Sequence, residues 1–327
     1  MQFRTELFPT LSPHPISLDQ GVMTLGSCFS DGMGQQLQQY KGRALVNPFG
    51  TVFNPLSAHA LLTRSITYNT QDLHTGLVER EGLWFHYDFH SSFSHSQAEG
   101  LLAQLTEAIE QTHRFLEKTR VLLLTWGTAF VYERLDTGQP VSNCHKILQK
   151  QFTKRLLTVE EILQSFQQMQ QLLQASFPAV KTVLTVSPVR HAKDTLVLNS
   201  VSKSTLRLAA HVAQEQMEHV SYFPAYELLL DDLRDYRFYG SDLLHPSPIA
   251  EAYIWEKFAA AFLDQEFNQF IKTWQQIQRD LAHRPFQPES QSHQRFLHQL
   301  LAKLQSLAEK VDVQTEIEFV KSQIKNS

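Results

Sequence analysis

The feature of this sequence that most constrains its fold is a series of short apolar runs, each ended by a glycine or a small polar residue. The clearest runs cover residues 22–26, 121–125 and 182–186. A continuous apolar run of this length is typical of a strand that is buried on both faces of a sheet. Helical patterns separate the runs, and strands that alternate with helices predict a parallel sheet with helices on both faces.

We therefore expect about five strands, near residues 22–26, 43–46, 121–125, 182–186 and 220–223. In open parallel sheets, ligands bind beyond the carboxyl ends of the strands. The residues that follow the expected strands are therefore candidates for a site, and they are Ser27, Cys28, Gly50, Thr128, Arg190, His191, Asp242 and His245. All of them fall at one edge of the predicted sheet.

Two small nucleophiles, Ser27 and Cys28, stand between the first expected strand and a helix over residues 29–40. A thiol at a helix N-terminus has its thiolate stabilised by backbone N–H groups and by the helix dipole. The same residues also fit an ordinary turn in which Ser27 caps the helix and Cys28 is a small buried apolar residue. This stretch alone does not choose between the two interpretations.

A second candidate is the pair Asp242 and His245, which follows the last expected strand. An offset of three residues in a turn lets the carboxylate bind one imidazole nitrogen while the other nitrogen faces outward. The carboxylate then fixes the tautomer, and the outward nitrogen can take a proton from a nucleophile. The motif is weak by itself in a chain with 15 histidines. Its place opposite the nucleophile turn makes it more specific.

The composition predicts a soluble cytoplasmic protein. A net charge of −4 gives no basic surface for nucleic acid or for membranes. Two cysteines are too few for a disulfide framework, the first residues lack a signal-peptide pattern, and no apolar run is long enough to cross a bilayer. We expect no cofactor. A metal site from Cys28, Cys144, His145 and His245 lacks the usual zinc spacing, so no metal is expected.

Five ordered blocks of the chain resemble the GSCFA-domain family, a branch of the SGNH (GDSL-like) hydrolases. The blocks are Gly26-Ser27-Cys28-Phe29, Asn47-Pro48-Phe49-Gly50, Asn143-Cys144-His145-Lys146, Ser187-Pro188-Val189-Arg190-His191 and Asp242-x-x-His245-Pro246. The name motif of the family ends in Ala, and this chain has Ser30 there. The resemblance spans residues 1–265 and implies a flavodoxin-like three-layer α/β/α sandwich that hydrolyses acyl or ester bonds. Residues 266–327 lie outside it and are predicted to form a C-terminal helical extension.

The resemblance also implies roles for individual residues. In GDSL-like enzymes the nucleophile lies two positions after the glycine, which is Cys28 here, with Ser27 where Asp usually stands. Asp242 and His245 match the final block, and Gly50 corresponds to the glycine whose N–H helps to form the oxyanion hole. Ala129 replaces the usual oxyanion asparagine. The donors that could substitute for it are Thr128, Asn54 and Asn143.

Two functions follow from these assignments. The first is an acyl hydrolase or acyltransferase that forms an acyl-enzyme on Cys28 or Ser27, with His245 as the base and Asp242 as its partner. The second is a catalytically inactive binding module, which the missing asparagine favours. The expected substrate is a small-molecule or carbohydrate-linked acyl ester, and the expected pocket residues are His90, Asn143, His145, Arg190 and His191.

Two further helical regions carry expectations of their own. Lys203 and Arg207 lie on a helix expected over residues 202–218, where we predict both to be surface charges. The C-terminal stretch has an apolar stripe at helical spacing from Phe296 to Val311. Packing of this stripe on the body and pairing with a second subunit as a homo-oligomer both fit the pattern.

Overall fold

The computed structural model describes residues 4–324 and is built around a five-stranded sheet in the order β10-β9-β5-β1-β2. All neighbouring strands are parallel. The bounds are β1 Gly21–Gly26, β2 Arg43–Val46, β5 Thr119–Trp126, β9 Lys181–Val186 and β10 Val220–Tyr222. The parallel sheet predicted from the apolar runs is therefore confirmed.

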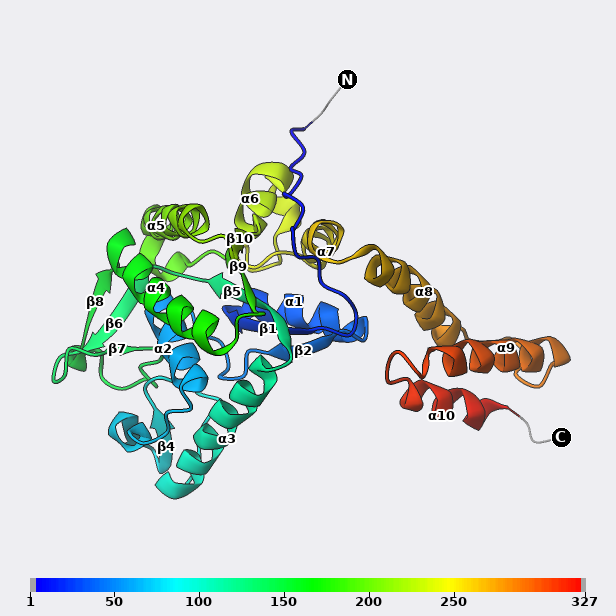
Figure 1. Ribbon diagram of the computed structural model, residues 1–327, viewed down its shortest axis with the longest axis horizontal. Helices are drawn as coiled ribbons and strands as arrows, with labels where there is room; N and C mark the ends of the chain where they lie inside the picture. Colours follow the sequence, from blue (N-terminus) through cyan, green and yellow to red (C-terminus); the bar gives the residue numbers. More distant parts are fainter. Residues whose placement is uncertain (1–3, 325–327) are drawn as a thin grey trace.

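The sheet is buried on both faces because successive strand residues point to opposite sides. Val22, Val121 and Leu123 pack into one core with helices α1 (Cys28–Gln39) and α7 (Pro248–Phe262). Met23, Leu122 and Leu124 pack into a second core on the other side. That core is shared with α2 (Pro55–Ile66), α3 (Ala98–Leu116), α4 (Val159–Ser176) and α5 (Thr195–Gln216). The result is the predicted three-layer α/β/α sandwich (Figure 1).

Two small antiparallel sheets interrupt the alternation. One is the hairpin of β3 (Leu77–Arg80) and β4 (Leu83–His86). The other has the order β7-β6-β8 and consists of β6 (Phe130–Arg134), β7 (Pro140–Val141) and β8 (Phe152–Leu156). None of the five strands expected from the sequence lies between β5 and α4, so this second sheet is a feature that the pattern missed.

Short helical turns complete the body. They are the 3₁₀ turns η1 (Leu73–Gly76), η2 (Gln149–Gln151), η3 (Ala192–Asp194) and η5 (Tyr236–Phe238), the single turn α6 (Ala225–Glu227) and the π-helix η4 (Leu228–Leu233). The turns η3 and η5 lie in the segments that carry the candidate residues after β9 and after β10.

The C-terminal residues form three helices that extend from the body beside α7 (Figure 1). They are α8 (Gln265–Ala282), α9 (Gln291–Leu307) and α10 (Gln314–Gln323). A break separates α7 from α8, because the chain leaves the helix at Leu263 and Asp264 caps α8 by accepting from the Phe267 N–H at 2.7 Å. The extension is held to α1 by the Trp274 indole, which donates to the Gln39 carbonyl at 2.9 Å. Within residues 4–324, no helix has the length and apolarity that a membrane crossing requires.

Candidate active site

The junction between β1 and α1 has a backbone that only glycine can supply. Gly26 has a φ of +141°, and a Cβ on it would lie 2.0 Å from the Thr125 carbonyl oxygen of the neighbouring strand. The Gly26 N–H is held by the Asn47 side-chain oxygen at 2.9 Å. The chain therefore turns sharply at the end of β1 and starts α1 immediately, which places Ser27 and Cys28 at the carboxyl edge of the sheet.

Ser27 and Cys28 have different environments in this turn. Ser27 is 1% exposed, and its hydroxyl caps α1 by accepting from the Phe29 N–H at 3.3 Å. Cys28 is the first residue of α1 and is only partly buried. Burial and then the nearby Asp31 carboxylate raise the pKa of the Cys28 thiol, whereas the N–H groups of Cys28 and Phe29 and the cation of Lys203 act to lower it. Of the two residues, Cys28 is the more exposed.

Asp31 belongs to a polar group beside Cys28. Its carboxylate accepts from the Asn47 side-chain amide at 2.7 Å, and burial raises its pKa while Asn47 and then His90 act to lower it. His90 packs against Gly50, where a Cβ would lie 2.4 Å from the His90 Cβ. The Gly50 N–H, expected in the oxyanion hole, donates to the Asn47 carbonyl at 2.8 Å. This N–H group is therefore already hydrogen-bonded within its own turn.

The end of β5 lies next to the nucleophile turn. A Cβ on Gly127 would lie 3.0 Å from the Phe53 carbonyl oxygen and 3.3 Å from the Ser27 Cβ, so the two segments pack closely at this glycine. The Thr128 N–H donates to the same Phe53 carbonyl at 2.9 Å, and the Thr128 hydroxyl contacts the Ser202 hydroxyl at 3.1 Å. Thr128 is therefore brought to the site, but its polar groups are already paired.

Asn54 is also at this edge, as the cap of α2. Its side-chain oxygen accepts from the Ser57 N–H at 2.9 Å. Its amide nitrogen donates to the Ser57 hydroxyl at 3.0 Å and to the Val141 carbonyl at a longer 3.5 Å. The long second hydrogen bond leaves this N–H the most readily available of the expected oxyanion donors.

Asp242 and His245 form the hydrogen bond that the sequence predicts. The Asp242 carboxylate contacts His245 Nδ1 at 2.6 Å and also accepts from the N–H groups of Leu244 and His245, at 3.0 Å each. These two N–H groups, and then His245, lower the pKa of Asp242 to about 2. The turn is fixed to the segment after β9, because the Arg190 N–H donates to the Leu244 carbonyl at 3.1 Å.

The Asp242–His245 pair is exposed, with 46% and 51% of the two side chains open to solvent. In the described part of the chain no hydrogen bond joins the Cys28 sulfur to His245. His245 nevertheless acts electrostatically on His191, because it contributes to lowering the pKa of His191. The structure thus places Cys28 and the Asp242–His245 pair, which together make up the expected catalytic group, at one edge of the sheet. Among the described residues, no hydrogen bond connects the two.

Lys203 is not a surface charge, and the prediction for this residue is wrong. Its side chain lies on the inner face of α5, it is 1% exposed, and its ammonium donates to the carbonyls of Gly127 and Ser187 at 2.7 Å each. Burial lowers the pKa of Lys203 to about 7, and Cys28 acts in the opposite direction. Arg207, on the same helix, is half-buried and pairs with Glu227 at 2.5 Å.

A signal for the burial of Lys203 was present in the sequence. Leu206, Ala209, Ala210 and Ala213 form the buried stripe of α5, and Lys203 lies one turn before Leu206 on that stripe. The prediction assumed that Lys203 lies at the surface, as most lysines do. Its position on the buried stripe of the helix indicated that it lies in the core.

A cavity of about 530 Å³ opens beside Thr128 and extends over the small sheet β7-β6-β8. Its walls combine aromatic rings with amides, and Lys146, Lys154, Lys193 and Asp194 give it two net positive charges. Of the expected pocket residues, Asn143 and His191 line it, together with Asn54 and Thr128, which were expected as oxyanion donors. Burial, followed by the Lys203 cation, lowers the pKa of His191 to about 4, although the Gly127 carbonyl favours its protonated form.

Three expected pocket residues, His90, His145 and Arg190, do not line this cavity. His90 packs against Gly50, as described above. His145 is 3% exposed, its ring stacks on Phe85, and its nitrogens contact the His86 carbonyl at 2.8 Å and the Ser91 hydroxyl at 3.1 Å. Its ring is therefore used to pack the β3–β4 hairpin onto the body. Arg190 packs its guanidinium over the rings of Tyr239 and Tyr236, at 4.0 and 5.2 Å. That contact lies in a separate small hollow of about 270 Å³.

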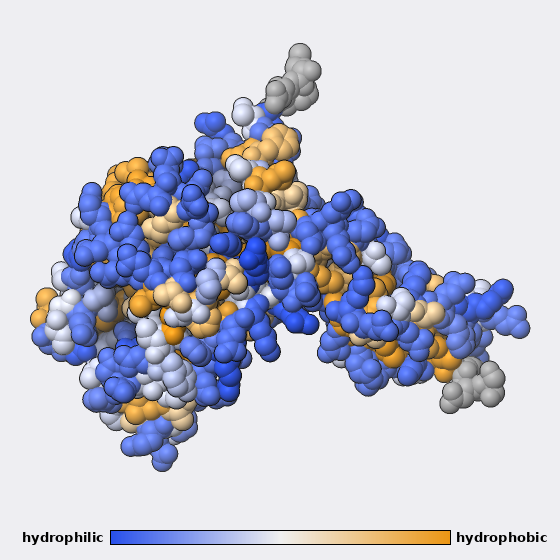
Figure 2. Space-filling model, viewed as in Figure 1, coloured by the Kyte–Doolittle hydropathy of each residue, from blue (hydrophilic) through white to orange (hydrophobic). Residues whose placement is uncertain are grey.

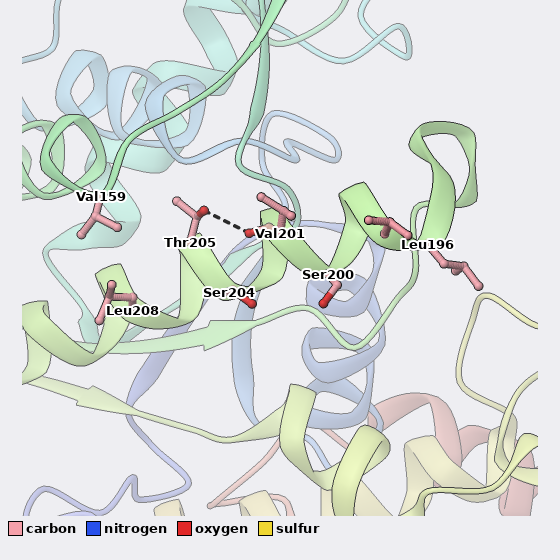
Figure 3. A pocket seen from close by; sticks show the side chains of 8 residues that line it. Val159, Leu196, Ser200, Val201, Ser204, Thr205 and Leu208 are labelled. Carbon is pink, nitrogen blue, oxygen red and sulfur yellow. Dashed lines mark hydrogen bonds between the residues drawn. The ribbon is translucent and has the colours of Figure 1, made fainter.

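The outer face of α5 carries another hollow, an open apolar groove. Figure 3 shows Leu196, Val201 and Leu208 along it, with Ser200 and Ser204 on the same helix, and Figure 2 shows hydrophobic residues gathered over α5. The inner face of the same helix carries Ser202 and Lys203, both buried. The groove is therefore separated from the site by the thickness of α5.

Within residues 4–324, no three His, Cys, Asp or Glu side chains are grouped closely enough to hold a metal ion. Cys144 lines the cavity, and burial raises the pKa of its thiol.

The fold is a three-layer α/β/α sandwich in which a cysteine begins the helix that follows the first strand. The chain belongs to the GSCFA family, whose model matches residues 21–258. A second model, described as the C-terminal domain of GSCFA domain proteins, matches residues 274–326. No curated protein is similar enough in sequence to count as a match.

Several solved structures are similar to this chain at low identity. One is a carbohydrate esterase family 3 protein from Talaromyces cellulolyticus, with 10% identity, a TM-score of 0.36, and coverage of 78% of this chain and 99% of that one. Another is a carbohydrate esterase family 2 enzyme from Corynascus thermopiles (Myceliophthora fergusii), with 12% identity, a TM-score of 0.39, and coverage of 77% and 68%. An acetyl esterase solved with an acetate ion gives 11% identity and a TM-score of 0.34, over 78% and 99%.

Proposed function

We propose that this protein is an acyl or ester hydrolase, or an acyltransferase, that works through a covalent acyl-enzyme on Cys28. The observation that carries the proposal is the 2.6 Å hydrogen bond between Asp242 and His245 at the sheet edge where Cys28 begins α1. Cys28 serves as the nucleophile in place of Ser27, because the Ser27 hydroxyl is buried and caps the helix.

The reaction follows from these positions. Asp242 accepts the Nδ1–H of His245, so Nε2 is free to take the proton of the Cys28 thiol. The thiolate attacks the acyl carbon, and the tetrahedral intermediate expels the alcohol or thiol, which takes the proton from His245. Water then attacks the thioester, or a hydroxyl of an acceptor does so in an acyltransferase, and the proton returns through His245 to the departing Cys28 sulfur.

The separation of Cys28 from His245 is compatible with this reaction if the exposed Asp242–His245 turn closes when substrate is bound. Hydrogen bonds between nucleophile and base are often long in enzymes without substrate. The closure would bring the half-exposed pair over the sulfur without changing the carboxylate–imidazole bond within the turn.

The cavity beside Thr128 is the proposed site for the substrate. Its aromatic walls, such as Phe130 and Tyr132, fit an apolar or sugar-ring surface, and Asn54 and Asn143 offer amide groups. We propose Asn54 as the donor to the oxyanion, because its bond to Val141 is long. An acyl ester of a small molecule or a carbohydrate fits this lining.

The second candidate, a binding module without turnover, is favoured by one observation. The N–H groups of Gly50 and Thr128 are both engaged by neighbouring carbonyls, and Ala129 supplies no side-chain donor. Because one oxyanion donor contributes about 10²–10³ in rate, a site without free donors would bind an ester and turn it over slowly.

A panel of short acyl esters and thioesters tests the proposal. We expect hydrolysis by wild type and a loss of about 10²–10⁴ in kcat for His245→Ala, with no acyl-enzyme in Cys28→Ala. Mass spectrometry of the acylated protein locates the acyl group on Cys28 or on Cys144. His211→Ala, a change on the outer face of α5, is the control. Equal, slow turnover by wild type, Cys28→Ala and His245→Ala would leave the binding module as the function.

A further inference from the structure

The cavity beside Thr128 has the opposite sign of charge from the chain as a whole. Three lysines line it, Lys146, Lys154 and Lys193, and among the described residues of the lining Asp194 is the only acidic one. The whole chain, in contrast, has a net charge of −4. Cations gathered around a concave surface with apolar walls raise the local concentration of anions. The charge of this cavity therefore bears on which ligand it selects.

Lys154 and Asp194 neutralise each other. The Lys154 ammonium forms a salt bridge with the Asp194 carboxylate, and it also lies over the rings of Phe130 and Tyr132, at 4.7 and 5.4 Å. This pair joins β8 to the turn η3 across the cavity. The two remaining lysines of the lining form no salt bridge within residues 4–324. The net positive charge of the cavity is therefore supplied by these two unpaired lysines.

The first unpaired lysine, Lys146, is presented by a turn with an unusual backbone. His145 and Lys146 have φ values of +48° and +56°, in the left-handed region that residues other than glycine usually avoid. Contacts hold the turn in this shape. The Asn143 side-chain oxygen accepts from the His145 N–H at 2.8 Å, and the His145 ring stacks on Phe85 with 4.9 Å between the ring centroids. The exposed Lys146 side chain thus extends from a firmly anchored turn.

The second unpaired lysine, Lys193, lies in a turn with the same property. Thr195, which ends this turn, has a φ of +69°, a rare value for a β-branched residue. The turn is held at its start by the His191 N–H, which donates to the Asn199 side-chain oxygen at 3.0 Å, and at its end by the salt bridge of Asp194. Strained backbone of this kind persists where the surrounding structure imposes it, and it gathers at ligand sites.

We propose that the cavity selects an acyl ester that carries an acidic group, a carboxylate or a phosphate, and that this group pairs with Lys146 and Lys193. The aromatic wall receives the uncharged part of the substrate. The ester then lies at Thr128, which follows the glycine packed against Ser27. This inference deepens the proposed function and rests on it for the ester bond, but binding of an acidic ligand can be measured without turnover.

The test compares two stable amide analogues of an aryl ester, the anion para-acetamidobenzoate and its neutral counterpart para-acetamidobenzamide, by isothermal titration calorimetry. We expect wild type to bind the anion more tightly, and the difference to shrink at high salt because salt screens the exposed lysines. In Lys146→Gln and in Lys193→Gln, Kd for the anion should rise about fivefold, with Kd for the neutral analogue unchanged. A third analogue, para-acetamidophenyl phosphate, distinguishes a phosphate from a carboxylate as the preferred acidic group.

Two control variants separate this site from the general surface charge. Lys150→Gln removes an exposed lysine of the neighbouring turn η2, outside the lining of the cavity, and should leave both Kd values unaltered. Lys193→Arg keeps the charge and should retain the affinity for the anion. An equal loss of anion binding in Lys150→Gln would overturn the proposal, because the effect would then come from the net charge of the protein.

Two further results would overturn the proposal: equal affinity of wild type for the anion and the neutral analogue, or no binding of either. Failure of the proposed function has a different signature. Anion binding that depends on Lys146 and Lys193, in a protein that hydrolyses none of the esters, would retain this site and reject the hydrolase. Ester hydrolysis that is indifferent to both lysines and to the charge of the ester would retain the hydrolase and reject this site.

Discussion

At the residue scale, the adjacent residues Ser27 and Cys28 differ in how their side chains are used. The Ser27 hydroxyl is used inside the fold as a helix cap, and the Cys28 sulfur begins the helix at the edge that a ligand can approach. The backbone N–H groups at this point favour an anion on the sulfur, whereas burial and Asp31 oppose it. The balance of these effects decides how reactive Cys28 is.

Replacing Ser27 by alanine separates the two roles. We expect Ser27→Ala to lower the free energy of unfolding by about 0.5–2 kcal/mol, because the Phe29 N–H loses its acceptor. Ester hydrolysis should stay close to the wild-type rate. Urea denaturation and the ester assay give the two readouts. Ser290→Ala, which removes the equivalent cap of α9 far from the site, is the matched control. Loss of all turnover in Ser27→Ala alone would instead make Ser27 the nucleophile.

At the scale of secondary-structure elements, the small sheet β7-β6-β8 supplies much of the cavity. Phe130 and Tyr132 of β6 point to the same side of the strand, as alternate residues do, and both line the cavity. Lys154 of β8 lies over both rings, at 4.7 and 5.4 Å. One face of this sheet thus combines aromatic surface with positive charge beside the nucleophile turn.

Truncation of Tyr132 tests whether this face binds substrate. We expect Tyr132→Ala to raise KM for the best ester of the panel, with kcat changed much less, because the ring contributes surface to a cavity whose lining does not include Cys28. Leu135→Ala, an exposed position just beyond β6 and outside the cavity lining, is the control. A fall in kcat at constant KM would contradict a binding role for this face.

At the scale of the whole molecule, His59 connects three elements inside the second core. It lies on α2, it is 1% exposed, and its ring packs against Trp126 of β5 and Phe166 of α4. Nδ1 contacts the Ser165 hydroxyl at 3.0 Å. Burial lowers the pKa of His59 to about 3, so the folded protein keeps this imidazole neutral at pH values where the unfolded chain binds a proton.

The pKa of His59 predicts how stability depends on pH. Above pH 6.5 neither state protonates this residue, and as the pH falls from 6.5 to about 3 only the unfolded state gains the proton. The free energy of unfolding therefore decreases as the pH falls through this range, by at most about 1.4 kcal/mol per pH unit. In His59→Leu the slope of the free energy of unfolding against pH should be smaller, as measured by urea denaturation. His211→Leu, on an exposed histidine, should keep the wild-type slope, and an equal slope in His59→Leu would refute the prediction.

The sequence predicted the strands well because their signal is local. An apolar run such as 121–125 is buried on both faces wherever it lies, and Gly26 ends its strand in a turn that needs glycine. The Asp242–His245 contact was predictable for the same reason, since the two residues share one turn. The small sheet was missed because its strands mix polar and apolar residues and pair only after the chain reverses.

The sequence by itself determined the parallel sheet, the edge at which the polar residues gather, and the candidate pair of Asp242 with His245. Only the tertiary structure decided that Ser27 is buried while Cys28 is partly exposed, that Lys203 lies inside, and that His145 and Arg190 pack away from the cavity. The physical reason is that strand and turn signals act within one segment. Burial, charge pairing and cavity walls depend on which distant segments the sheet brings together.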